Sequence, residues 1–321
     1  MVLHLKKVSK YVNRLIKSKK GYDFPNWNLT KNNNFWLNMT IGPRGSGKTN
    51  VILSLLEIEK DGMLTGENHV FWISPTHDPK VEEFASKYGD NMTFYDELNI
   101  KTFNEVIETI RDKTTEWKQK KYIFDLFEKY LKNGEDSLEL EEMEILLTSG
   151  MLDEDTDHKQ MIDSFEHRFP PRSVIIIDDS MGSPLISSSQ SKQGKEFIRW
   201  LIRHRHDYTS VFILSQAYRG LSLSIRSNAN CIFFMPCKDR ATSKSIFDEF
   251  STVFDGRREN YIEALDLLDK QPVGDFLFVY YDNDKFLRMG FDREITFTND
   301  DDDADANDSE KEQKTDLPKK E

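Results

Sequence analysis

The sequence has little cysteine and no long apolar run, and both absences limit what the protein can be. Its only cysteines, Cys231 and Cys237, are separated by five residues and have no second pair beside them. Two thiols at this spacing exclude a disulfide framework and a cysteine-based zinc site, and they suit a reducing compartment. No apolar run approaches the roughly 18 residues of a membrane-spanning helix, so we do not expect a membrane protein. The basic N-terminus is not followed by an apolar segment of signal-peptide length.

The charge of the 321-residue chain is distributed unevenly. The formal net charge is −12, and half of it lies in residues 298–321, which hold ten acidic and four basic residues. Such a segment buries too little apolar surface to fold, so we expect a disordered acidic tail. Residues 1–20 carry seven Lys or Arg and no acid. We assign residues 1–30 to a basic arm that either contacts a partner or is simply solvated. The acidic average does not exclude a nucleic-acid partner, because the local field decides.

Short apolar runs alternate with segments of helical periodicity over the rest of the chain. Strands are predicted at 35–41, 69–75, 92–95, 174–177, 210–216 and 230–236, followed by a hairpin at 275–291. Helical spacing is found at 50–60, 195–206, 242–254 and 260–268, and a long, highly charged helical segment extends over about 102–165. The alternation predicts an α/β domain at residues 31–297, with a mostly parallel central sheet flanked by helices. The charged segment is predicted to be a helical insertion between two strands of this sheet.

A phosphate-binding loop is the most specific motif in the sequence. Residues 42–49 match G-x-x-x-x-G-K-[ST] in full and stand between a predicted strand and a predicted helix, the context that the motif requires. The glycines allow a tight loop whose backbone N–H groups wrap phosphates, and the helix N-terminus adds partial positive charge. We expect Lys48 to reach the β- and γ-phosphates of ATP and the Thr49 hydroxyl to ligate Mg²⁺. The predicted nucleotide-binding residues are Gly42, Pro43, Arg44, Gly45, Ser46, Gly47, Lys48 and Thr49.

Two strands are predicted to end in polar side chains that face the nucleotide. The run 174–177 has no polar face, so it is predicted to be buried on both sides, and it ends in two acids. In P-loop proteins a second strand ends in an Asp that holds Mg²⁺, which predicts this role for Asp178. Asp179 fits a general base that polarises the attacking water, with the alternative that it caps the following segment. Gln216, at the end of 210–216, is predicted to sense the γ-phosphate or hold the water, with a loop hydrogen bond as the alternative.

The spacing of these motifs leaves room for an extra strand between the phosphate-loop strand and the Asp178 strand. The run 69–75 and a further segment lie between the two motifs in the sequence. This arrangement predicts a P-loop NTPase of the additional-strand, RecA-like type. That type is found in ATPases that hydrolyse with an acidic base and drive motion.

Arginines flank the Gln216 strand on both sides. Arg199, Arg203 and Arg205 precede it, and Arg226 follows it. A guanidinium brought to the γ-phosphate stabilises the charge of the transition state, and in a ring ATPase it comes from the neighbouring subunit. Each of the four is a candidate arginine finger, with a surface charge or a salt-bridge partner as the alternative.

Taken together, "GPRGSGKT", "VIIIDDS", "RHRH" before "FILSQ", and "LSIRSN" after it resemble a known family. It is the FtsK/HerA-type genome-packaging ATPases of large double-stranded DNA viruses, a group shared with poxvirus-like viruses, virophages and polinton-like elements. The likeness covers roughly residues 35–285. It implies an oligomeric ring, a pentamer or hexamer, that hydrolyses ATP with Mg²⁺ and pumps double-stranded DNA into a preformed capsid. It also implies that Asp179 is the base, that Gln216 is the sensor and that Arg226 is the preferred arginine finger, with Arg205 in reserve.

The resemblance further implies a capsid or membrane-vertex partner, and a location in the host-cell cytoplasm, in a viral factory or with the virion. The insertion and the acidic tail match no motif of the family. The small, polar segment 180–195 is a candidate lining for a DNA channel, or else a surface loop. Two other functions stay open on the residues alone: a P-loop kinase of a nucleotide or small metabolite, and a nucleotide-gated scaffold without enzymatic activity.

Overall fold

The computed structural model describes most of the chain. The described residues are 2–7, 35–58, 68–152, 171–187, 190–237, 239–281, 286–291 and 293–298. The basic arm beyond residue 7 and the acidic tail after residue 298 lie outside the described residues, so both stay predictions. Within the described ranges, no helix is both long and apolar enough to span a membrane.

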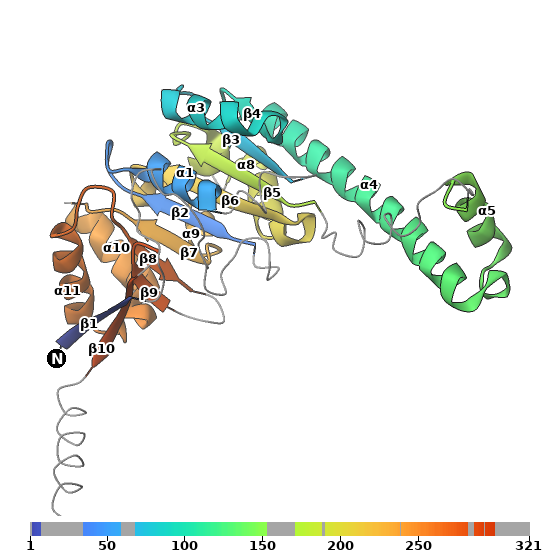
Figure 1. Cartoon of the computed structure of the whole chain (residues 1–321). Helices are drawn as coiled ribbons and strands as arrows, with labels where there is room; N and C mark the ends of the chain where they lie inside the picture. The colour runs from blue at the N-terminus through green and yellow to red at the C-terminus, as the bar shows by residue number, and fades with distance from the viewer. Residues whose placement is uncertain are drawn as a thin grey trace, which may run out of the picture.

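A ten-stranded mixed sheet forms the centre of the described structure (Figure 1). Its strands are β1 (Val2–Lys7), β2 (Leu37–Ile41), β3 (His69–Ile73), β4 (Met92–Tyr95), β5 (Ser173–Asp178), β6 (Thr209–Ser215), β7 (Cys231–Phe234), β8 (Leu277–Tyr280), β9 (Phe286–Met289) and β10 (Arg293–Thr298). They lie in the order β1-β10-β9-β8-β7-β2-β6-β5-β3-β4. The strands from β7 to β4 in this order are parallel, and β8, β9, β10 and β1 extend the sheet antiparallel. The predicted α/β fold with a largely parallel central sheet is confirmed.

Helices cover both faces of the parallel strands. One face carries α1 (Lys48–Ile58) and α3 (Pro79–Tyr88); the other carries the first turns of α4 (Ile100–Asn133), α8 (Lys192–Leu201), α10 (Arg240–Phe250) and α11 (Arg258–Asp269). Along β5, Val174 and Ile176 join the core under α1, whereas Ile175 and Ile177 join the core on the opposite face. Since successive side chains of a strand point to opposite faces, this two-sided burial explains the run without a polar side.

The extra strand of the additional-strand type is present, but it is not the one that sequence order suggests. β6 lies between the phosphate-loop strand β2 and the Asp178 strand β5, whereas β3 lies on the far side of β5. The expectation that the run 69–75 provides this strand was therefore wrong. Parallel strands are joined by crossovers, so a strand that follows β5 in the sequence can insert beside it.

The predicted helical insertion between β4 and β5 is confirmed and forms a projecting arm (Figure 1). α4 is a single helix of 34 residues, about 50 Å long at 1.5 Å per residue. It begins at Asn99, whose side chain accepts a hydrogen bond from the Thr102 N–H, and ends at Gly134. α5 (Leu140–Thr148) packs against its far end through a small separate core of Leu126, Phe127, Leu146 and Met151. The predicted insertion beyond residue 152 lies outside the described residues.

Two features of the sheet and its connections were not predicted. β1, from the first residues of the basic arm, pairs antiparallel with β10 along its whole length, from Val2 opposite Thr298 to Lys7 opposite Arg293. The segment 180–195 is not one continuous loop, because α7 (Pro184–Ser187) and the start of α8 fall within it. Its proposed place in a DNA channel stays a prediction.

Candidate nucleotide-binding site

The phosphate-binding loop joins the end of β2 to the start of α1. The Gly42 N–H donates to the Ser215 carbonyl of the neighbouring β6 at 3.1 Å, which fixes the first residue of the loop to the sheet. A Cβ on Gly42 would lie 2.5 Å from the Cβ of Met235, so only glycine fits there. Gly47, with φ of 99°, adopts a conformation that other residues rarely take. α1 then begins at Lys48, so its unpaired N–H groups lie next to an open loop, the arrangement that binds phosphates.

Lys48 folds back across the loop that it follows. Its Nζ donates to the Gly42 carbonyl at 2.9 Å and to the Pro43 carbonyl at 3.0 Å. Burial lowers the pKa of Lys48, and the nearby carboxylates of Asp178 and Asp179 oppose the shift. The ammonium group therefore lies inside the loop and close to both acids, where a bound polyphosphate would share it.

Thr49 and Asp178 form the candidate Mg²⁺ site. The Thr49 hydroxyl donates to the Asp178 Oδ2 at 3.2 Å, although the two residues are 129 positions apart. Burial raises the pKa of Asp178, while the hydrogen bond from Thr49 and the charge of Lys48 lower it. No group of three or more His, Cys, Asp or Glu within the described ranges is arranged to hold a metal. One hydroxyl and one half-buried carboxylate fit Mg²⁺, which takes few protein ligands and completes its shell with water and substrate phosphates.

Asp179 and Gln216 meet beside this site, because Asp179 directly follows β5 and Gln216 directly follows β6. The Gln216 Nε2 donates to the Asp179 Oδ1 at 2.9 Å, and both side chains are exposed. Asp179 has φ of 49°, in the left-handed region, so the backbone turns sharply at the end of β5. The sequence alternatives were a capping role for Asp179 and a loop hydrogen bond for Gln216. The observed bond joins the two side chains predicted to be base and sensor, and it is also a hydrogen bond to the loop after β5, so the roles of both residues stay predictions.

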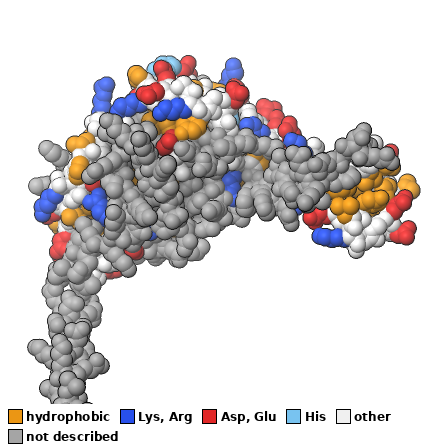
Figure 2. Space-filling model, viewed as in Figure 1, with side chains coloured by type: hydrophobic (Ala, Val, Ile, Leu, Met, Phe, Trp, Pro, Cys, Tyr) orange, Lys and Arg blue, Asp and Glu red, His pale blue; other side chains and the backbone are white. Residues whose placement is uncertain are grey.

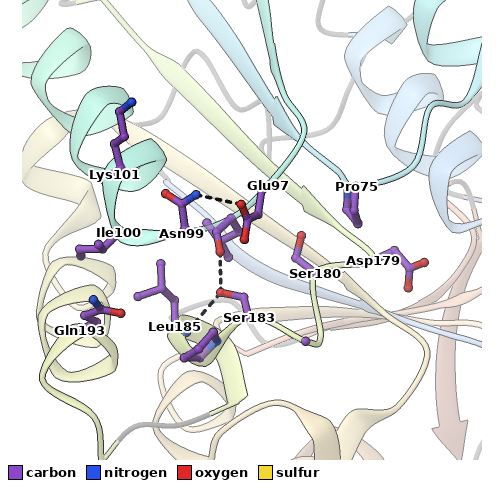
Figure 3. A pocket seen from close by; sticks show the side chains of 13 residues that line it. Pro75, Glu97, Asn99, Ile100, Lys101, Asp179, Ser180, Ser183, Leu185 and Gln193 are labelled. Carbon is purple, nitrogen blue, oxygen red and sulfur yellow. Dashed lines mark hydrogen bonds between the residues drawn. The ribbon is translucent and has the colours of Figure 1, made fainter.

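A pocket of about 580 Å³ opens beside Asp179. It is lined by Pro75 after β3, by the segment before α4, by the loop between β5 and α7, and by Gln193 of α8. Asp179 stands at one end of the pocket and Gln193 at the other (Figure 3). The Ser183 Oγ donates to the Leu98 carbonyl at 2.7 Å and so ties the two walls together. This pocket was not found from the sequence, because its walls come from four separate segments.

Arg226, the preferred arginine finger, is engaged within its own subunit. It forms an ion pair with Glu249 of α10, its side chain is only 15% exposed, and its guanidinium lies 4.9 Å from the centre of the Tyr218 ring. The Tyr218 hydroxyl donates to the same Glu249 carboxylate, and burial raises the pKa of Tyr218. Arg226 would have to leave these contacts to reach a neighbour. Glu249 was not singled out from the sequence, because no local pattern links it to residue 226.

Arg205 lies at the opposite edge of the sheet from the phosphate loop. It is exposed in η3 (His204–Asp207), directly before β6, whose other end carries Gln216. The structure therefore brings neither Arg205 nor Arg226 to the nucleotide site of its own chain. A contribution of either residue to a neighbouring subunit stays a prediction.

A groove between α4 and α8 gathers basic side chains. Its volume is about 750 Å³, and it is lined by Phe103, Asn104, Ile107, Arg111, Glu196, Arg199, Trp200, Arg203, His206 and Asp207. Asp207 is already engaged, because the Trp200 Nε1 donates to it at 2.7 Å and the Arg111 Nε lies 3.8 Å away. Arg199 and Arg203 are exposed at the rim. The sequence showed these two arginines but not their grouping with Arg111, which comes from the insertion.

The comparisons with known proteins give structural neighbours only. No protein-family model matches the chain, and no curated protein matches it either. Among solved structures, the chain is similar to the genome packaging NTPase B204 from Sulfolobus turreted icosahedral virus 2 in complex with AMP. The TM-score is 0.44 and the identity 13%, over 81% of this chain and 98% of that one.

Two further solved structures are similar to the chain. One is B204, the DNA-packaging ATPase from Sulfolobus turreted icosahedral virus, with a TM-score of 0.41 and 15% identity over 79% of this chain and 95% of that one. The other is EssC (ATPases 2 and 3) from Geobacillus thermodenitrificans, with a TM-score of 0.44 and 11% identity over 86% of this chain and 43% of that one. Likenesses with TM-scores of this size do not show what this chain does.

Proposed function

We propose that the chain is an ATP-hydrolysing motor that moves double-stranded DNA, as the genome-packaging ATPases whose motifs it resembles do. The observation that carries the proposal is the convergence of three strand ends on one loop. Thr49 meets Asp178 at 3.2 Å beside the loop, and Asp179 meets Gln216 at 2.9 Å. A site that only bound nucleotide would have no use for a carboxylate base held by an amide. The pair therefore favours hydrolysis over a non-enzymatic scaffold.

Each side chain then has a defined task. The loop N–H groups and Lys48 bind the phosphates, and Thr49 with Asp178 would hold Mg²⁺, which neutralises charge on the β- and γ-phosphates when bound. Asp179 accepts a proton from the attacking water as the water oxygen bonds to the γ-phosphorus and the bond to the β-phosphate oxygen breaks. Gln216 engages one oxygen of Asp179, which leaves the other oxygen free for the water.

The pocket beside Asp179 supports a second candidate function. A kinase needs space for an acceptor hydroxyl next to its base, and the 580 Å³ pocket provides such a space. In that case Asp179 would deprotonate the acceptor instead of water. The kinase and the motor therefore share the phosphate site and differ in what occupies this pocket.

The groove between α4 and α8 is our proposed contact for the DNA backbone. Phosphate contacts need only exposed cations, and Arg111, Arg199, Arg203 and His206 line this groove. Two acids also line the groove: Asp207 is already bound by Trp200 and Arg111, and the exposed Glu196 leaves an excess of positive charge. DNA held here through phosphates would be bound without sequence preference.

The end of the arm suits a protein partner rather than DNA. Residues 134–150 carry six acids and no base. Leu140 is 87% exposed and Leu147 61%, and Figure 2 shows apolar side chains gathered with acids at this end of the molecule. DNA would be repelled by such a surface, so we assign it to a protein component such as a capsid or vertex protein.

A ring is part of the proposal, and it needs an arginine from each neighbour. Arg205 is exposed and free to act in this way, whereas Arg226 must first leave Glu249. Mixing inactive Arg205→Ala subunits with wild-type protein should reduce ATP hydrolysis more than dilution alone does. Hydrolysis in simple proportion to the wild-type fraction would exclude Arg205 as a finger acting between subunits.

The deciding experiment is steady-state ATP hydrolysis by the purified protein, titrated with double-stranded DNA and then with salt. A motor should be stimulated by DNA, and the stimulation should fade as salt rises. Lys48→Ala provides the control, because loss of its ammonium should abolish binding or turnover. ATP consumption that requires an added small acceptor, and ignores DNA, would establish the kinase instead. Tight ATP binding without turnover under any condition would overturn both enzymes and leave the scaffold.

A further inference from the structure

A surface turn stands beside the phosphate loop, on the side away from the hydrolytic groups. β8 runs antiparallel to β7, and its first residue, Leu277, is opposite Phe234, the last residue of β7. The residues just before β8 therefore lie at the carboxyl edge of the parallel strands, where the phosphate loop also lies. A Cβ on Gly47 would be only 3.1 Å from the Gly274 Cα, so the turn and the loop are in contact.

The turn is held rigidly in place. The Pro272 carbonyl accepts the Asp275 N–H at 3.1 Å, and Gly274, at the third position of the turn, has φ of 102°, which favours glycine. Arg293 of β10 fastens the turn at both ends, because its guanidinium donates to the Gln271 Oε1 and to the Asp275 Oδ2, each at 2.8 Å. Asp275 is buried, so this ion pair is shielded from water.

Val273 projects from the tip of this turn and is 89% exposed. A single exposed apolar residue is ordinary on a protein surface. The position of Val273 is informative because the turn beneath it is fixed, so the valine is presented at one defined place beside the loop. The residue that follows it, Gly274, is the one that touches the phosphate loop at Gly47.

The sheet order shows which part of a nucleotide faces this turn. The groups that act on the γ-phosphate, Gln216 and the Asp178–Asp179 pair, lie at the ends of β6 and β5, on one side of β2. β7 and β8 lie on the other side of β2. With its γ-phosphate at β5 and β6, a nucleoside triphosphate bound along the loop extends its ribose and base toward β7 and β8, where Val273 stands.

We propose that Val273 is the apolar wall against which the base of the bound nucleotide packs. The isopropyl group would cover one face of a purine ring, as apolar side chains do in small-molecule sites. Because Arg293 fixes the turn beforehand, little conformational entropy is lost when the base binds. The inference rests on the nucleotide binding proposed above and adds the residue that recognises the base.

The test compares ATP with inorganic tripolyphosphate, which has the phosphates but no base, in calorimetric binding titrations. Val273→Ser should weaken ATP binding roughly fivefold, as expected when the base covers only part of the valine side chain, and should leave tripolyphosphate binding unchanged. Val273→Leu should retain ATP binding. Leu140→Ser is the matched control, since it removes an apolar side chain of similar exposure far from the loop, and it should change neither affinity.

Two results would overturn the inference. Equal weakening of ATP and tripolyphosphate in Val273→Ser would mean that the turn only supports the phosphate loop. Unchanged ATP binding in that variant would mean that the base packs elsewhere. Wild-type protein that binds neither compound would instead overturn the proposed function itself, and the inference with it.

Discussion

Asp179→Asn tests the base assignment with little change in shape. Asparagine at this position keeps an oxygen that accepts the hydrogen bond from the Gln216 Nε2, observed at 2.9 Å, but it does not accept a proton from water. General-base catalysis is typically worth about 10²- to 10⁴-fold, so we expect kcat to fall by that range. ATP binding should persist, because Lys48 and the Thr49–Asp178 pair are untouched. An Asp179→Asn enzyme with normal turnover would refute the assignment.

Gln216→Ala extends the test to the amide. If Gln216 acts by positioning Asp179, the loss of one exposed hydrogen bond of about 1 kcal/mol should lower the hydrolysis rate roughly fivefold. The same change made in Asp179→Asn should then have almost no further effect, because the group being positioned is already inactive. Single-turnover hydrolysis by wild type, both single variants and the double variant completes the cycle. Equal losses in both backgrounds would refute positioning and show that Gln216 acts on the nucleotide directly.

Three further predictions follow from the same structure. Burial lowers the pKa of Lys48 and raises that of Asp178. Lys48 binds phosphate when protonated, so the affinity for Mg²⁺-free ATP should fall as pH rises through the lowered pKa. Asp178 holds Mg²⁺ when ionised, so the affinity of the site for Mg²⁺ should fall as pH falls through the raised pKa of Asp178. Calorimetry at several pH values measures both the ATP affinity and the Mg²⁺ affinity. Arg226→Ala should destabilise the fold by about 1–3 kcal/mol in urea unfolding, because it leaves the Glu249 carboxylate with the Tyr218 hydroxyl but without a cation; an unchanged midpoint would contradict the ion pair. The double variant Arg199→Ala/Arg203→Ala should show weaker stimulation of hydrolysis by DNA. The slope of its DNA affinity against salt concentration should fall by the equivalent of about two phosphate contacts; an unchanged slope would mean that DNA binds outside this groove.

The parts of the fold that were predictable are those with local patterns. The six parallel strands, the helical insertion and the β8–β9 hairpin all appear in the sequence as apolar runs or helical spacing. The phosphate loop was predictable for the same reason, because its eight residues are contiguous. The Thr49–Asp178 contact then followed, since a buried strand that ends in an acid at the carboxyl edge of the sheet must face that loop.

Other features depend on contacts between distant segments, and these left no local signal. β1 and β10 lie at one edge of the sheet, where a strand can carry polar side chains on one face. Their apolar runs are therefore short and flanked by charged residues, and they are not recognisable as strands in the sequence. For Arg226 the alternative of a salt-bridge partner is the arrangement observed, but the sequence does not indicate its partner, because Glu249 lies 23 residues away on another helix. Val273 likewise has no local signal, since only the antiparallel β8 brings its turn to the phosphate loop.

The position of β6 accounts for the side-chain pairing on which the proposed hydrolysis depends. With β6 inserted, β2 and β5 are two strand spacings apart, about 10 Å, yet the Thr49 Oγ1 and the Asp178 Oδ2 are separated by 3.2 Å. The start of α1 must therefore lean across the end of β6 toward β5. Gln216 follows that strand end, and its exposed side chain reaches Asp179. Were β6 absent, Thr49 and Asp178 could still meet, but no amide would stand beside the base. The proposed base would then lack the hydrogen bond that Gln216 gives it.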